Sequence, residues 1–148
     1  PSAARPLGGM SVLFDTSVLI AQERGRWDAI AFNEQVVGDS EAAISAITVS
    51  EFLEGVFRAP TGRRQESRRG FFEALVASHV VFPFGIEEAK THARLKADIS
   101  AQGVAIGAHD LLIAATCLHH DFDLATLNTA EFERIPGLRL SPAEKFLR

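Results

Sequence analysis

The chain has 148 residues, with 15 Lys and Arg against 19 Asp and Glu and a formal net charge of −4. This length predicts one domain, and apolar residues make up 47% of the chain, which excludes a disordered protein. A single cysteine excludes a disulfide scaffold, and no apolar run reaches the roughly 18 residues of a transmembrane helix. The acidic balance counts against a protein that binds nucleic acid through bulk positive charge.

Residues 1–10 lack the apolar core of a secretory signal, and their Pro and Gly residues predict no regular structure. We interpret them as a leader or an expression remnant, because Met10 directly precedes an apolar run and is a candidate start. We expect one domain over 11–148, a cytoplasmic location and no membrane association.

Short apolar runs then alternate with longer helical patterns. The runs typical of strands are 11–15, 42–47, 80–84, 124–127 and 138–140. Periodicity and capping signals predict helices over 16–25, 27–37, 48–58, 63–78, 86–101 and 108–119, with a last helical turn after Pro142. This alternation predicts an α/β fold in which a mainly parallel sheet of about five strands carries helices on both faces.

Carboxyl and amide side chains fall where strands end or helices begin. Asp15 ends the first strand, Glu51 and Asp110 each lie in a first helical turn, and Asn128 and Glu131 follow the fourth strand. Because parallel strands end at one edge of a sheet, we expect these groups to converge. Converging carboxylates repel one another, and Mg²⁺ or Mn²⁺ relieves that repulsion. Such a site can hydrolyse phosphodiester bonds.

Each acid also has a structural interpretation. Asp15 is a candidate N-cap. Glu51 takes the acceptor position of a capping box with Thr48, and Asp110 suits the positive end of its helix dipole. These interpretations leave unexplained why an acid precedes the most apolar helix. On the residues alone, both interpretations remain open.

Four motifs, in order, resemble those of PIN domains and VapC-type toxins. They are Leu13–Ile20, Ser45–Gly55, Ile106–Ala115 and Leu124–Leu138. The resemblance runs over nearly the whole chain, from about residue 11 to 140. It implies a PIN-like three-layer α/β/α sandwich and a metal-dependent endoribonuclease that is the toxin of a toxin–antitoxin pair. It also implies Mg²⁺ or Mn²⁺, homodimerisation, an RNA substrate and a cognate antitoxin.

Carried onto this chain, the resemblance implies that Asp15 and Asp110 are direct metal ligands. Glu51 matches the acid that completes the site, through the metal or its water. Three hydroxyl positions that orient carboxylates or water are matched by Thr16, Ser17 and Thr126.

The fourth acidic position has two candidates, Asn128 and Glu131, and the number of metal ions stays open. The glycine expected before the fourth strand is missing, because the chain has Asp121-Phe122-Asp123 there.

The only dense basic cluster consists of Arg58, Arg63, Arg64, Arg68 and Arg69. Contact with RNA phosphate, pairing with an acidic antitoxin segment and a solvated helix face all remain open for it. The five histidines show no metal-ligand spacing, so no zinc site is predicted. His109 neighbours Asp110 and is a candidate contact of the acidic site.

Two other classes of function remain. One is a PIN-like binding module without turnover, which would bind Mn²⁺ weakly or not at all. The other is a different acid-edge phosphate-handling protein, such as a receiver or a phosphohydrolase. A phosphohydrolase with an aspartate nucleophile has a second aspartate two residues later, where this chain has Ser17 after Asp15.

Overall fold

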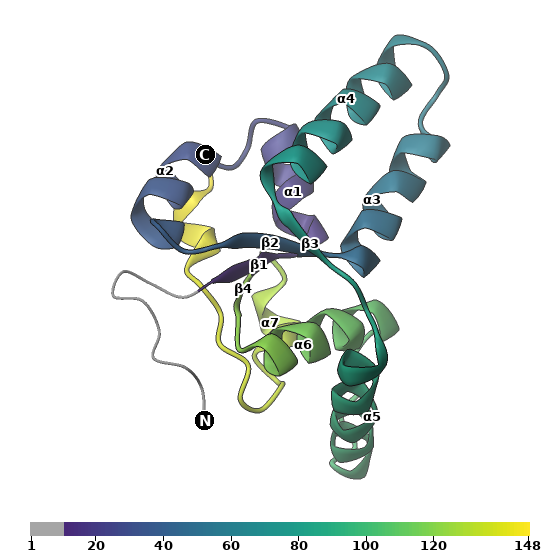
Figure 1. Cartoon of the computed structure of the whole chain (residues 1–148), viewed down its shortest axis with the longest axis vertical. Helices are drawn as coiled ribbons and strands as arrows, with labels where there is room; N and C mark the ends of the chain where they lie inside the picture. Colours follow the sequence, from purple (N-terminus) through teal and green to yellow (C-terminus); the bar gives the residue numbers. More distant parts are fainter. Residues whose placement is uncertain (1–10) are drawn as a thin grey trace.

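A four-stranded parallel sheet with strand order β3-β2-β1-β4 forms the centre of the molecule (Figure 1). The computed structural model describes residues 11–148, and the expected leader over 1–10 lies outside them. The strands are β1 (Val12–Phe14), β2 (Ala42–Ser45), β3 (Val80–Phe82) and β4 (Asp123–Ala125). The predicted α/β class and parallel sheet are confirmed.

Helices cover both faces of this sheet (Figure 1). One layer contains α1 (Thr16–Glu23), α2 (Ala29–Phe32), η1 (Asn33–Val37), α3 (Ala46–Arg58), α4 (Arg63–Ser78) and η2 (Ala143–Phe146). The other contains α5 (Ile86–Ala101), α6 (Ala108–His120) and α7 (Thr129–Phe132). Among the described residues, no helix is long and apolar enough to cross a membrane.

The alternation of side chains along β1 divides the core in two. Val12 and Phe14 pack with Trp27 and Phe32 under the α1–α4 layer, while Leu13 packs under α5 and α6. Successive strand residues point to opposite faces, so a strand buried on both sides is apolar throughout. The sheet therefore fixes where β1, β2 and β4 end, and these ends carry the polar groups of interest.

The expected fifth strand at 138–140 is wrong as a full strand. It is reduced to a single parallel bridge between Leu124 and Leu140. The Leu124 N–H donates to the Arg139 carbonyl at 2.9 Å, and the Ser141 N–H donates to the Leu124 carbonyl at 2.9 Å. The chain then turns into η2 before a longer ladder forms.

The helix predicted over 27–37 begins later and changes character. Asp28 caps α2, because its Oδ1 accepts the Ala31 N–H at 3.0 Å, so Trp27 lies outside the helix. Trp27 is buried, and its indole N–H donates to the Ala143 carbonyl at 2.9 Å. After Phe32 the helix continues as the π-helical turn η1.

Candidate active site

Asp15 lies at the junction of β1 and α1, in the N-cap position. Its backbone is extended there, but its side chain makes no capping hydrogen bond. Its carboxylate is buried, and Oδ2 accepts the hydroxyls of Ser17 and Thr126, each at 2.8 Å. Both hydroxyls therefore hold the same oxygen, and neither of them occupies Oδ1.

The two hydroxyls are themselves fixed by the backbone after β4. The Leu127 N–H donates to Ser17 Oγ at 3.0 Å, and the Asn128 N–H donates to Thr126 Oγ1 at 3.0 Å. Each hydroxyl therefore accepts one hydrogen bond while it donates another to Asp15. This arrangement sets the orientation of the Asp15 carboxylate without using a positive charge.

The predicted capping box of Thr48 and Glu51 is wrong. Ser45, the last residue of β2, caps α3 instead, because its Oγ accepts the Ile47 N–H at 3.0 Å. The helix begins directly after the strand, so Glu51 falls in its second turn rather than its first. The capping interpretation of Glu51 thereby loses its basis.

Glu51 is held by side chains from two other helices. Oε1 accepts the Thr16 hydroxyl at 3.1 Å, and Oε2 lies 3.0 Å from His109 Nδ1. His109 was only a candidate contact on sequence, and its position directly before Asp110 is the signal that pointed to it. These two bonds direct Glu51 toward the start of α6.

Asp110 and Glu131 meet at the N-terminus of α6. Burial, followed by the negative charges of Asp15, Glu131 and Glu51, raises the pKa of the Asp110 carboxyl to about 6. A hydrogen bond between the two carboxyl groups contributes to the same rise. Since Asp110 feels all three other carboxylates, the four groups share one site. Geometry agrees for two of these groups, because Asp110 Oδ2 and Glu131 Oε1 each lie 3.5 Å from the position that a Cβ on Gly107 would take.

Glu131 is stabilised in its ionised form. The Gly107 N–H donates to Glu131 Oε1 at 2.8 Å, and this bond is the main cause of the lowered pKa of Glu131. Hydrogen bonds with Asp110 and Asn128 act in the same direction. Glu131 therefore contacts Asp110, while Asn128 supports Glu131. Sequence reasoning missed the Gly107 N–H, which the glycine directly before α6 could have suggested.

The donor set of this site consists of oxygen atoms on Asp15, Glu51, Asp110 and Glu131. Within residues 11–148, no Lys or Arg forms an ion pair with any of the four. Carboxylate oxygens that are not paired with Lys or Arg are the ligands that hard divalent cations such as Mg²⁺ prefer. The residues present therefore fit a bound divalent cation.

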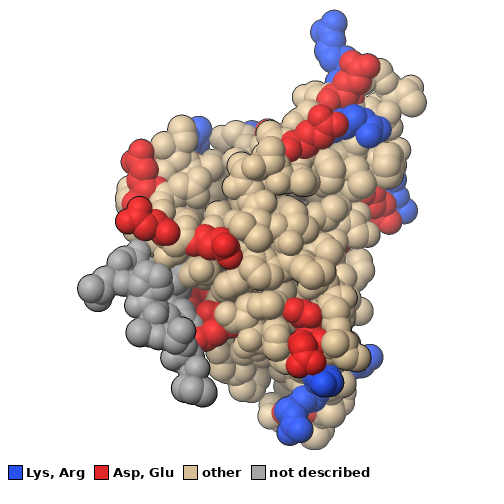
Figure 2. Space-filling model, viewed as in Figure 1, with Lys and Arg blue, Asp and Glu red and all other residues tan. Residues whose placement is uncertain are grey.

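The five arginines do not act as one group. Arg68 is part of the scaffold, because its guanidinium makes two hydrogen bonds of 3.0 Å to Glu23 and lies 5.0 Å from the centre of the Phe52 ring. A Cβ at Gly55 would lie 2.9 Å from this guanidinium, so glycine provides its space. The others, Arg58, Arg63, Arg64 and Arg69, are exposed. Figure 2 shows basic side chains at the outer end of the α3–α4 hairpin.

Comparisons with known proteins agree with this geometry. The family model of the PIN domain matches residues 12–138. Ribonuclease VapC1 of Rickettsia felis is 38% identical over 131 residues, covering 88% of this chain and 95% of the relative. Ribonuclease VapC of Rickettsia bellii is 36% identical, with the same coverage of 88% and 95%.

A solved structure shares the fold. VapBC2 from Rickettsia felis, crystallised with a DNA fragment from its promoter, superposes with a TM-score of 0.80 at 25% identity. The match covers 89% of this chain and 98% of that one. With the acidic site at the carboxyl edge of a parallel sheet, these matches show that the chain belongs to the PIN domain family and, within it, to the VapC ribonucleases.

Proposed function

We propose that this protein is a metal-dependent endoribonuclease that hydrolyses RNA phosphodiester bonds as the toxin of a toxin–antitoxin pair. The observation that carries the proposal is the meeting of four carboxyl groups, expressed in the raised pKa of Asp110, with no Lys or Arg paired to any of them among the described residues. A site of this kind is poorly suited to a purely structural role, because its charges repel one another until a cation is present.

Asp15 and Asp110 are the proposed direct ligands of Mg²⁺ or Mn²⁺, with Glu51 and Glu131 completing the acidic site. When bound, the cation supplies Lewis-acid stabilisation of the charge that develops on the phosphate oxygens. Asp110, with a pKa of about 6, would be mostly ionised near neutral pH and so able to serve as a ligand, and Glu131 is held in place by the Gly107 N–H. Asp15 keeps its orientation through the hydroxyls of Ser17 and Thr126.

Glu51 is the proposed residue that orients the attacking water. Its Oε1 is fixed by the Thr16 hydroxyl, and its Oε2 by His109. A carboxylate with both oxygens fixed presents its remaining lone pairs in a defined direction. Asn128 acts indirectly, by supporting Glu131.

The biological setting is proposed from the relatives. The two Rickettsia relatives are named VapC ribonucleases, and the solved neighbour is named VapBC2. We therefore propose an RNA substrate, a cognate antitoxin, a homodimer, a single functional domain over 11–148 and a cytoplasmic location. The exposed arginines Arg58, Arg63, Arg64 and Arg69 are the proposed contacts for RNA phosphates or for an acidic antitoxin segment.

The test is cleavage of purified total RNA with Mg²⁺ or Mn²⁺, followed by mapping of the cleaved ends. Asp15→Asn and Asp110→Asn each remove one proposed ligand, so we expect the cleavage rate to fall roughly 10³-fold, about 4 kcal/mol of transition-state stabilisation. Chelation by EDTA should abolish cleavage by the parent protein.

The matched control is Asp39→Asn, which removes an exposed aspartate outside the site. It should cleave at the parent rate. If Asp15→Asn and Asp110→Asn also cleave at that rate, the assignment is wrong. Binding of Mn²⁺ without cleavage of any RNA would instead support a binding module.

A further inference from the structure

A second group of potential metal ligands lies at the other end of α6. Glu88 in the first turn of α5 meets His119 and His120 in the last turn of α6, and their ligand atoms all lie within 4.8 Å of one another. Ten residues of helix separate Asp110 from His120, which corresponds to about 15 Å along the axis. This group is therefore separate from the acidic site.

The sequence did not predict this group, for a physical reason. Successive residues of a helix point about 100° apart, so adjacent histidines are poor partners on one helix. Here the helix ends at His120, and the two imidazole rings lie edge to face with centres 4.7 Å apart. The third member, Glu88, comes from 32 residues away in the sequence.

Glu88 and His120 are already oriented. Glu88 is buried, with Oε1 accepting the Gly85 N–H at 2.9 Å and Oε2 accepting His120 Nε2–H at 2.7 Å. The His120 ring stacks on that of Phe122, with ring centres 5.5 Å apart, and its centre lies 4.8 Å from that of the Phe82 ring. The bond from the Gly85 N–H lies one step behind the ligand atoms, and bonds of this type orient the ligands of protein metal sites.

His119 is the member of this group that solvent can reach most readily. It is exposed, and its ring lies edge to face against that of His120. Two imidazoles and one carboxylate form the ligand set of open zinc sites, in which water takes the fourth position. Mg²⁺ prefers oxygen ligands, so this set discriminates against the cation of the acidic site. The negative end of the α6 dipole adds attraction for a cation.

We propose that Glu88, His119 and His120 form a second metal site, which takes Zn²⁺ or a similar transition-metal ion and links α5 to α6. Binding replaces the hydrogen bond between His120 and Glu88: the proton on Nε2 leaves to water, and the nitrogen and the carboxylate oxygen both coordinate the ion. Ligand atoms on one zinc ion lie about 3 to 4 Å apart, given bonds of about 2.0 to 2.2 Å. A small rotation of His119 closes the remaining difference.

The test is Co²⁺ titration followed by visible absorption, with Zn²⁺ calorimetry as a second measurement. Untagged full-length protein carrying Asp15→Asn and Asp110→Asn is the background, so that the acidic site does not contribute. We expect one equivalent to bind, with the intense visible bands of a four-coordinate nitrogen and oxygen site. His119→Ala should weaken binding by about 10- to 100-fold or more, since it removes a ligand rather than a supporting residue.

Two further variants make the result specific. Glu88→Gln keeps an acceptor for the Gly85 N–H but removes the carboxylate, and should weaken binding similarly. His92→Ala removes an imidazole from α5 that contacts Phe84, outside the group, and should bind as the background does. The proposal would be overturned if His119→Ala bound Co²⁺ as tightly as the background does, or if the background bound no Co²⁺. Mg²⁺-supported RNA cleavage should be unchanged when His119→Ala is made alone in the otherwise unaltered protein, so this result does not depend on the proposed nuclease activity.

Discussion

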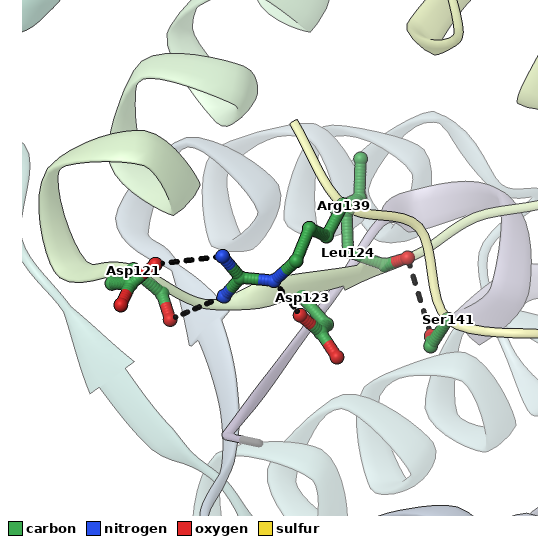
Figure 3. Close-up of polar contacts among 5 residues, drawn as sticks. All are labelled: Asp121, Asp123, Leu124, Arg139 and Ser141. Carbon is green, nitrogen blue, oxygen red and sulfur yellow. Dashed lines mark hydrogen bonds and ion pairs between the residues drawn. The ribbon is translucent and has the colours of Figure 1, made fainter. Parts of the chain in front are cut away.

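Two acidic groups of the molecule handle their charge in opposite ways. Asp121 lies just before β4, Asp123 is its first residue, and both are paired with Arg139 (Figure 3). Arg139 Nη1 donates to Asp121 Oδ1 and Nε donates to Asp123 Oδ1, each at 2.8 Å, and Nη2 reaches the Asp121 carbonyl at 3.0 Å. We call these three residues the Arg139 clamp.

The acidic site beyond the carboxyl end of β4 contains more carboxyl groups and no such arginine among the described residues. A charge that the protein neutralises itself contributes to the scaffold, whereas a charge left for an external cation is available for chemistry. The comparison therefore separates structural acids from candidate catalytic acids on the basis of their partners. Variants in each group should separate stability from activity.

After loss of a proposed metal ligand, the largest expected effect concerns the hydroxyls around Asp15. Thr126→Val removes one of the two donors to Asp15 Oδ2 and the acceptor of the Asn128 N–H. We expect RNA cleavage to fall by about 10- to 100-fold, as for other residues that support a metal ligand. Single-turnover cleavage at saturating Mg²⁺ measures this effect.

Thr116→Val is the matched control, because Thr116 is equally buried and bonds only within α6, to the Leu112 carbonyl at 2.9 Å. Its cleavage rate should equal that of the parent. Equal losses in both variants would mean that the Thr126 effect is one of general stability.

A change in the Arg139 clamp should lower stability and leave RNA cleavage unchanged, in contrast to the change at Thr126. Arg139→Ala leaves Asp121 and Asp123 without their guanidinium, and we expect the free energy of unfolding to fall by about 1 to 2 kcal/mol, because the pairs are only partly buried. Urea denaturation measures the change, with the exposed Arg94→Ala as control. The RNA cleavage rate of folded Arg139→Ala should stay at the parent value, and a large loss would contradict a purely structural role.

The contribution of the acidic site to the free energy of unfolding should depend on pH and on Mg²⁺. The pKa of Asp110 is about 6 in the folded protein against an ordinary value of 3.8, so the folded state binds more protons between these values. Without metal, the free energy of unfolding should therefore fall as pH rises from about 4 to 6, by roughly 1 kcal/mol after solvent screening. Adding Mg²⁺ at pH 7.5 should restore it, and Asp110→Asn should remove both effects. Thermal unfolding across this pH range measures both effects. If the stability of Asp110→Asn still changes with pH as that of the parent does, Asp110 is not the cause of the pH dependence.

The smallest expected effect concerns Asp121, because the family carries a glycine before the fourth strand and this chain does not. Asp121 occupies that place with a φ of 59°, a left-handed conformation that favours glycine. Asp121→Gly relieves strain but loses one bond to Arg139, so the free energy of unfolding should stay within about 0.5 kcal/mol of the parent. Asp121→Ala keeps the strain and loses the same bond, and should be about 1 to 2 kcal/mol less stable than Asp121→Gly. Equal stability of the two variants in urea would contradict this balance.

Sequence reasoning worked best where local signals were strong. The predicted helices 63–78 and 86–101 match α4 and α5 residue for residue, because their breakers and periodicity are local. The start of α3 was misplaced, since Ser45 and Thr48 are both plausible caps and only the sheet decides between them. The short helix α7 was not predicted, and the π-helical turn η1 has no sequence signature comparable to a cap.

The same division holds for the candidate site. Asp15 and Asp110 could be found because the end of a strand and the start of a helix are readable in the sequence. The contacts of His109 and Gly107 with acids 58 and 24 residues away could not, since they depend on how α3, α6 and α7 pack together. Glu88, His119 and His120 escaped for the same reason, because two helices packed in three dimensions bring them together.

The central claim is that four carboxyl groups share one cation site at the start of α6. Titration of the Asp110 side-chain carboxyl by ¹³C NMR, in metal-free protein and with Mg²⁺, tests it directly. The pKa should be about 6 without metal, and Mg²⁺ should lower it, because the cation favours the ionised form. A pKa close to 3.8 that Mg²⁺ does not change would contradict the shared site.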